Sequence, residues 1–198
     1  MDFTGVGTHE PRTVEAGRRA AVIAPVLFRD DRPHVLFTKR ADHLGEHPGQ
    51  MSFPGGGTEP SDDGLEATAL REANEEIGLR PDEVTFHGRL DDILTITDYA
   101  VSPFVATIPD REYEPDHREV AEIVALSVDD LTSRANYESE RRDHPTYGDI
   151  RLHFFYVDGY TVWGATGRML VQLLELTTDW RMPEAVDRVV DPDADYPV

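Results

Sequence analysis

The chain contains no cysteine, which excludes disulfide bonds, thiolate metal sites and a cysteine nucleophile. It is also poor in positive charge, with 19 basic against 39 acidic residues among 198 and a formal net charge of −20. A field of this sign repels nucleic acid, so we expect no nucleic-acid partner. Its apolar runs are all shorter than the roughly 20 residues that span a bilayer. Since the N-terminus also lacks a secretion-signal pattern, we expect a cytoplasmic protein with no membrane partner.

Lysine is nearly absent as well. Lys39 is the only lysine, against 18 arginines, and aspartate outnumbers glutamate. Such acidic surfaces suit concentrated salt, where repulsion between like charges is screened over about 3 Å at 1 M. The composition therefore predicts a protein from a halophilic cytosol, with an acidic mesophile protein as the alternative.

What is present indicates one folded domain. Apolar residues make up 39% of the chain and recur along its whole length, which is long enough for one core but short for two. We expect a polar N-terminal arm or leading helix over residues 1–18, a single domain over 19–182, and a loose acidic tail over 183–198. Either a monomer or a homodimer is expected, because mutual repulsion opposes association only at low salt.

Hydrophobic periodicity gives the expected elements. Alternating apolar residues predict strands over residues 20–28, 33–40, 84–90, 100–108, 119–127 and 151–157. Helices are predicted over 61–78 and 165–177, with a short helical turn over 128–133 and polar loops over 41–52 and 134–148. Strands mixed with two main helices indicate an α+β fold, an α/β/α sandwich with a mixed β-sheet between helices.

Three glutamates share one face of the helix predicted over residues 61–78. Glu72 stands three and four residues before Glu75 and Glu76, a spacing that puts helical side chains side by side. A solvated acidic face is one explanation, because glutamate is a good helix former. The other is a hard cation such as Mg²⁺, which binds carboxylate oxygens together with water and substrate phosphate.

A run of glycines precedes this helix. Residues 53–57 read FPGGG, a turn in which glycine lets the backbone adopt unusual angles and approach a ligand closely. Ser61 and Asp62 are good helix caps, and Gly78 is expected to end the helix in a left-handed conformation. The whole unit is suited to holding a metal-bound phosphate.

The unit resembles the Nudix box, Gly-x5-Glu-x7-Arg-Glu-apolar-x-Glu-Glu-x-Gly-apolar. The second half of the box matches Arg71, Glu72, Ala73, Glu75, Glu76, Gly78 and Leu79. In the first half aspartate replaces glutamate, and two alignments are open. One pairs Gly57 with Asp63. The other pairs Gly56 with Asp62 and inserts one residue, as in subgroups resembling coenzyme A pyrophosphatases; we prefer it because it keeps FPGG in its usual place.

A second motif narrows the resemblance. Leu36–Ala41 (LFTKRA) and Gly49–Gly56 (GQMSFPGG) together resemble the signature that coenzyme A pyrophosphatases carry before the box. Gly45 departs from that signature, which usually has an arginine there. Val101–Val105 and Tyr160–Thr166 resemble the middle strand and the closing strand-to-helix segment of the same subgroup.

The resemblance runs from about residue 20 to residue 176 and implies a Nudix-like fold. It implies hydrolysis of a nucleoside diphosphate linked to another group, with Mg²⁺ or Mn²⁺ to neutralise phosphate charge. The metal ligands it implies are Glu72, Glu75, Glu76 and the Gly55 carbonyl, while Arg71 would orient a carboxylate. The implied substrate contacts are Lys39, Arg40, Gln50, Ser52 and Gly56, although Lys39 and Arg40 also suit a salt-bridged strand end.

The general base is often supplied from outside the box. Glu119 and Glu122 are the candidates, and an ordinary surface alternation on a strand explains them equally well.

Coenzyme A or an acyl derivative is the expected substrate, cleaved to 3′,5′-ADP and (acyl-)4′-phosphopantetheine. ADP-ribose, dinucleotides and (d)NTPs are alternatives, because the box reads only metal and phosphate. A non-catalytic nucleotide-binding module of the same fold is a further alternative, which the presence of all three box glutamates disfavours.

The spacing His43-x-x-Glu46-His47 also matches an inverted zinc-protease motif. Gly45 within that stretch and Pro48 directly after it oppose the helix that such a site needs.

Overall fold

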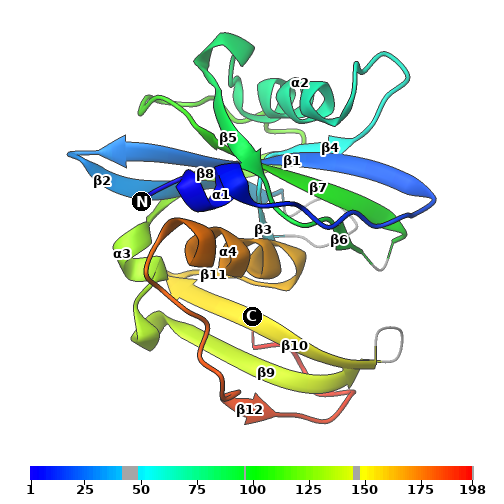
Figure 1. Ribbon diagram of the computed structural model, residues 1–198, viewed down its shortest axis with the longest axis vertical. Coiled ribbons are helices and arrows are strands. Elements are labelled where there is room, and N and C mark those ends of the chain that lie inside the picture. The colour runs from blue at the N-terminus through cyan, green and yellow to red at the C-terminus, as the bar shows by residue number, and fades with distance from the viewer. Residues whose placement is uncertain (42–48, 96, 145–147, 198) are drawn as a thin grey trace.

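The computed structural model describes residues 1–41, 49–95, 97–144 and 148–197, which form two β-sheets and two long helices stacked in layers (Figure 1). The first sheet consists of β1 (Arg18–Arg29), β2 (Arg32–Arg40), β3 (Met51–Ser52), β4 (Gly55–Gly57), β5 (Thr85–Arg89), β6 (Ile93–Leu94), β7 (Tyr99–Thr107) and β8 (Val120–Ser127). The second consists of β9 (Tyr137–His144), β10 (Gly148–Val157), β11 (Tyr160–Val162) and β12 (Arg188–Val189).

The helices are α1 (Thr4–Thr8), α2 (Leu65–Ile77), α3 (Val128–Leu131) and α4 (Gly164–Thr177), with 3₁₀ turns at Pro81–Glu83 and Arg134–Asn136. α2 covers one face of the first sheet, and α4 lies on the opposite face, between the two sheets (Figure 1). This confirms the expected α+β class with a mixed sheet between helices. None of the helices in the described ranges has the length and apolar character needed to cross a bilayer.

β1 is the central strand of the first sheet. It pairs antiparallel with β2 and β4 and parallel with β7. Its alternate residues face two cores: Val22 packs in the core shared with α4, and Ile23 packs in the core under α2. A strand buried on both faces must be continuously apolar, as residues 20–28 are.

The start of α2 was predicted too early. The helix begins at Leu65, after Gly64 with φ of 92°, and neither Ser61 nor Asp62 caps it. Asp62 instead accepts hydrogen bonds from the Glu59 N–H and the Thr68 hydroxyl and pairs with Arg71. The helix end is confirmed, because Gly78 has φ of 65° and its N–H donates to the Asn74 carbonyl.

The loop predicted over residues 134–148 is wrong for its centre, which forms β9. The sequence there is rich in charge, but two of the charged residues pair with each other inside the fold, while Arg141 and Asp143 stay exposed. The Glu140 carboxylate accepts two hydrogen bonds from Arg142, and both side chains are almost fully buried. Charge alone therefore misidentifies this strand.

The expectation of a loose C-terminal tail is also wrong for the part that forms β12. Arg188 and Val189 pair in parallel with β9, and the Ala194 carbonyl accepts a hydrogen bond from Arg142 at 2.9 Å. The segment is therefore held to the second sheet by backbone pairing. The boundaries of the single domain, at 18/19 and 182/183, stay predictions.

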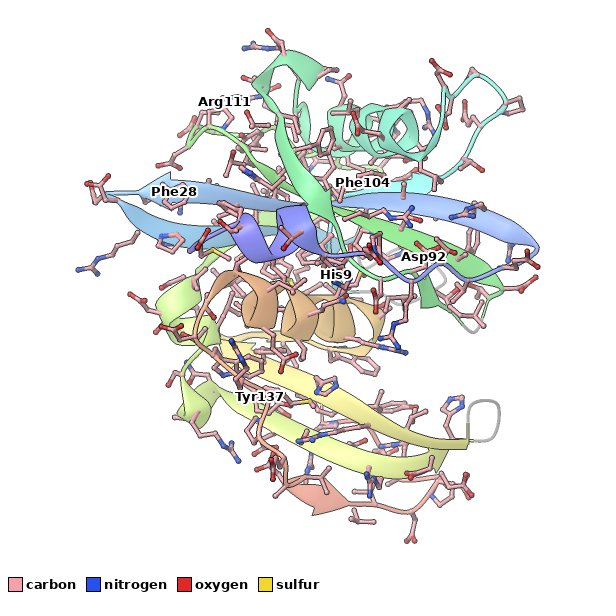
Figure 2. All side chains as sticks on the ribbon, in the orientation of Figure 1. His9, Phe28, Asp92, Phe104, Arg111 and Tyr137 are labelled. Carbon is pink, nitrogen blue, oxygen red and sulfur yellow. The ribbon has the colours of Figure 1, made fainter. Side chains whose placement is uncertain are left out.

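The leading helix expected near the N-terminus is present as α1. It packs against α4 and β5, with Val6 buried. Farther along, His9 and Arg12 both hydrogen-bond the Asp91 carboxylate. Figure 2 shows His9 between the first sheet and α4. This segment is thus anchored across the junction of the two layers.

His153 on β10 makes the stability of the fold depend on pH. Its Nδ1 lies 2.8 Å from the Tyr137 hydroxyl, on the second sheet (Figure 2). Burial, assisted by Arg151 and Arg168, lowers the pKa of His153 to about 4. An unfolded chain has a histidine pKa of about 6.5. Between these values the unfolded state binds more protons, so stability falls as the pH drops through this window.

We expect the wild type to lose about 2 kcal/mol more than a His153→Gln variant between pH 7 and pH 5. The glutamine keeps a hydrogen-bonding group but does not titrate. Urea unfolding at both pH values measures the difference, and equal losses in the two proteins would contradict a neutral buried His153.

Candidate active site

Two of the three box glutamates face the glycine strand β4. The Gly55 N–H donates a hydrogen bond to Glu76 Oε2 at 3.0 Å. A Cβ added at Gly56 would lie 2.6 Å from the Glu72 carboxyl carbon, so a side chain there would displace Glu72. Glu72 and Glu76 are half-buried, whereas Glu75 is exposed. The glycines therefore let the backbone of β4 lie directly against the acidic face of α2.

This acidic face has an excess of negative charge. Burial is the main cause that raises the pKa of Glu72 and brings that of Glu76 to about 8. Repulsion adds to both shifts: Glu119 acts on both residues, Glu75 acts on Glu72, and Glu72 acts on Glu76. The Gly55 N–H and Arg40 oppose the shift at Glu76 only in part. A cation bound here would relieve this repulsion.

Arg71 organises the same face. Its guanidinium donates to Asp62 through two nitrogens at 2.9 and 3.1 Å, to Glu72 Oε1 at 3.0 Å and to the Gly57 carbonyl at 2.9 Å. A weaker contact of 3.3 Å reaches Glu75. These bonds lower the pKa of Asp62 and raise that of Arg71. Arg71 thus joins β4, the loop before α2 and the carboxylates.

The geometry supports one of the two alignments of the box. Asp62 is the carboxylate that pairs with Arg71, and Gly56 is the glycine that contacts Glu72. Asp63, by contrast, is exposed. Asp62 was not among the predicted site residues. The available signal was the preferred alignment, which puts Asp62 at the acidic position in the first half of the box. The sequence was nevertheless interpreted there as favouring a helix cap.

The two candidate general bases, Glu119 and Glu122, have different surroundings in the structure. The charge of Glu119, just before β8, acts on both Glu72 and Glu76. Glu122 lies on β8, where its carboxylate accepts a hydrogen bond from the Tyr160 hydroxyl. Tyr160 was not anticipated as a partner, because the two residues are far apart in the sequence. Of the two candidates, Glu119 is thus the one whose charge is known to act on the acidic face.

Lys39 and Arg40 also have different surroundings. Arg40 is half-buried and its charge acts on Glu76. Lys39 pairs across strands with Glu122, and its ammonium lies 6.0 Å from the centre of the Tyr160 ring. A bulge between Lys39 and Arg40 disturbs the register with β8 at this point. Arg40 thus acts on the acidic face, while Lys39 lies beside Glu122 and Tyr160.

The remaining predicted contacts lie close to the end of β2. The Gln50 carbonyl accepts the Arg40 N–H at 3.0 Å. The Ser52 hydroxyl lies 3.0 Å from that of Thr38, so it is engaged within the sheet. The segment from His43 to Pro48, with Gly45 and the zinc-like spacing, lies outside the described residues.

The donor set fits a hard divalent cation. Glu72, Glu75 and Glu76 supply carboxylate oxygens, the ligand type that Mg²⁺ and Mn²⁺ prefer. Within the described ranges, no group of three or more acidic or histidine side chains is arranged so that it could hold a metal ion by itself. An open set is compatible with Mg²⁺, which keeps several waters and takes only a few protein oxygens.

Comparison with known proteins identifies the family. The NUDIX domain model matches residues 17–147. An Enterobacter protein named "Uncharacterized Nudix hydrolase NudL" is 37% identical over 82% of this chain and 84% of its own. A Yersinia pestis protein of the same name is 32% identical over 85% of this chain and 84% of its own. The crystal structure of the Nudix hydrolase RenU from M. smegmatis has a TM-score of 0.50 and 18% identity over 63% of this chain and 82% of that one, a likeness of fold alone.

The chain therefore belongs to the Nudix family. It is an enzyme of that family, a pyrophosphohydrolase. Nudix hydrolases generally use divalent metal ions such as Mg²⁺ or Mn²⁺.

Proposed function

We propose that this Nudix hydrolase cleaves the pyrophosphate bond of coenzyme A or its acyl derivatives, giving 3′,5′-ADP and (acyl-)4′-phosphopantetheine. The observation that carries the proposal is the paired signature before the box. β2 and β3 pair through Thr38 with Ser52 and Lys39 with Met51, so both halves of the signature come together beside Arg40, whose charge acts on Glu76.

Each residue of the site has a role in this proposal. Glu72, Glu75 and Glu76, with the Gly55 carbonyl, would hold a divalent cation, which would supply charge neutralisation at the phosphate and activation of water. Arg71 positions Glu72. Arg40 and Lys39 bind phosphate oxygens, with Gln50, Ser52 and Gly56 as further contacts. Glu119 accepts the proton of the attacking water as the bond from phosphorus to the bridging oxygen breaks.

A pair of variants separates the two candidate bases. We expect Glu119→Gln to lower kcat by about 10² to 10⁴, the usual contribution of a general base. Glu122→Gln, on the neighbouring strand, should leave kcat within a few-fold, because Glu122 is engaged by Tyr160. Steady-state kinetics on coenzyme A with Mg²⁺ measures both, and the opposite order would exchange the roles.

The substrate is tested by comparing kcat/KM for coenzyme A, ADP-ribose, NADH and dNTPs. We expect coenzyme A or its acetyl ester to have the highest value. A higher value for ADP-ribose or dNTPs would keep the Nudix chemistry and contradict the coenzyme A assignment. No turnover of any of them by folded protein would favour a binding module instead.

We also propose that the protein works in a halophilic, cytoplasmic environment, as its net charge of −20 suggests. Screening of that charge should raise the melting temperature between dilute buffer and molar KCl. Thermal melts followed by circular dichroism measure this. Equal stability in the two buffers would contradict halophilic adaptation.

A further inference from the structure

A cavity of about 610 Å³ lies at the N-terminal end of α4. Its volume is in the range of small-molecule sites. Its walls come mainly from α4, β6, β10 and the C-terminal segment, and the apolar part includes Leu94, Ile150, Leu152, Trp163, Ala165 and Tyr196. The residues of the acidic face do not line it. The cavity is thus a separate space, and its walls are mainly hydrophobic.

Two residues of this wall are unusually exposed for their type. In the described part of the chain, four large hydrophobic residues are exposed, and Leu94 at 42% and Tyr196 at 38% are two of them. Both line the same cavity. Apolar surface left open in a concave site is typical of a place where an apolar ligand binds.

The aromatic rings of the cavity are already packed against other groups. Trp163 stacks on Phe154, with ring centres 6.0 Å apart, and lies 4.8 Å from the Tyr196 ring. The Arg142 guanidinium lies 4.1 Å from the centre of the Tyr196 ring. A nucleobase would need a free ring face to stack on. The aliphatic side chains offer no such face but suit a flexible hydrocarbon chain.

The two arginines at the cavity, Arg151 and Arg168, have different surroundings. The Arg151 guanidinium binds the C-terminal segment, where it donates hydrogen bonds to the carbonyls of Pro183, Glu184 and Ala185. Arg168, by contrast, is exposed in the second turn of α4. It is the residue that a 3′-phosphate would use if the nucleotide half entered the cavity instead.

Gln50 connects the cavity to the active site. It lines the cavity, and its carbonyl accepts the Arg40 N–H at 3.0 Å. Arg40 in turn acts on Glu76. β3 begins at the residue after Gln50, and it contacts β11, the strand that ends just before Trp163. A substrate with its diphosphate at the acidic face could therefore extend one arm past Gln50 into the cavity.

We propose that this cavity binds the acyl end of an acyl-pantetheine arm, so that the enzyme prefers octanoyl and longer acyl thioesters of coenzyme A to free coenzyme A. The inference rests on the proposed function, since it assigns one part of that substrate to a place in the fold. Leu94 and Tyr196 are then specificity-determining residues. The C-terminal segment contributes one wall of the site through Tyr196.

The experiment is a calorimetric titration of the full chain with S-octanoyl-pantetheine, which lacks the diphosphate and therefore reports binding without hydrolysis. Each buried methylene tightens binding about four-fold. We expect the octanoyl compound to bind at least about a hundredfold tighter than S-acetyl-pantetheine. Leu94→Asp should weaken the binding of the octanoyl compound at least about tenfold, because it places a charge against the hydrocarbon chain of the ligand.

The matched control is Phe28→Asp. Phe28 is 43% exposed and lies at the end of β1 (Figure 2). It should leave the octanoyl affinity unchanged. Equal affinity for the octanoyl and acetyl compounds, or equal effects of the two aspartates, would overturn the inference.

Two further outcomes have distinct meanings. If Arg168→Gln weakens coenzyme A but not dephospho-coenzyme A, and chain length has no effect, the nucleotide half occupies the cavity and the inference is overturned. If octanoyl-pantetheine binds in a Leu94-dependent way but no coenzyme A compound is hydrolysed, the cavity assignment is supported and the proposed function fails.

Discussion

Replacing Glu76 by glutamine is expected to lower kcat by at least about a thousandfold while the protein stays folded. A cation that stabilises phosphate charge contributes several kcal/mol to the transition state, and about 4 kcal/mol corresponds to this factor. Glutamine keeps the shape of Glu76 and can still accept the Gly55 N–H. It removes the negative charge, which is what the cation needs.

The stability of Glu76→Gln should be equal to or higher than that of the wild type. Burial and the neighbouring carboxylates disfavour the charged form of Glu76, so its neutral counterpart relieves repulsion. Glu66→Gln is the matched control, because Glu66 is an exposed residue in the first turn of the same helix. Activity of Glu76→Gln within tenfold of the wild type would show that Glu76 does not hold the metal.

Arg71→Gln is expected to lower kcat/KM by about a hundredfold and to raise the Mg²⁺ concentration that gives half-maximal activity by 10- to 100-fold. Arg71 contacts Asp62, Glu72 and Gly57 at once. Its loss leaves the Asp62 carboxylate without its ion-pair partner, so we also expect a lower free energy of unfolding. Metal titrations and urea unfolding measure the two effects separately.

Two variants test whether Arg71 acts by positioning. Arg71→Lys keeps the charge but not the planar fork, so it should restore stability more than metal affinity. Asp62→Asn combined with Arg71→Gln should be less harmful than the sum of the two single changes, because the pair acts as a unit. Unchanged metal dependence in Arg71→Gln would reduce Arg71 to a purely structural residue.

The helix and its acidic face could be predicted because the information is local. Glu72, Glu75 and Glu76 are brought together by helical periodicity alone, and Gly78 ends the helix as its type requires. The sequence predicted that the glycine turn would allow a close approach of the backbone, but not that Gly56 would approach Glu72. Which carboxylate meets it depends on how α2 packs on β1 and β4.

Features set by long-range packing could not be predicted in the same way. The separation of Glu119 from Glu122 depends on the pairing of β8 with β2 and on a bulge in that pairing. β9 was taken for a loop because Glu140 and Arg142 are charged, yet they neutralise each other inside the fold. The cavity beside Trp163 needs β6, β10 and the C-terminal segment together, and these are far apart in the sequence.

The most direct test of the central claim is hydrolysis of coenzyme A by the full chain in molar KCl with Mg²⁺, with the products resolved by chromatography. The proposed function predicts equal amounts of 3′,5′-ADP and 4′-phosphopantetheine from the wild type, and at least about a thousandfold less from Glu76→Gln. The proposed function would be contradicted if the wild type left coenzyme A intact but hydrolysed ADP-ribose rapidly. It would also be contradicted if the wild type and Glu76→Gln gave equal amounts of product.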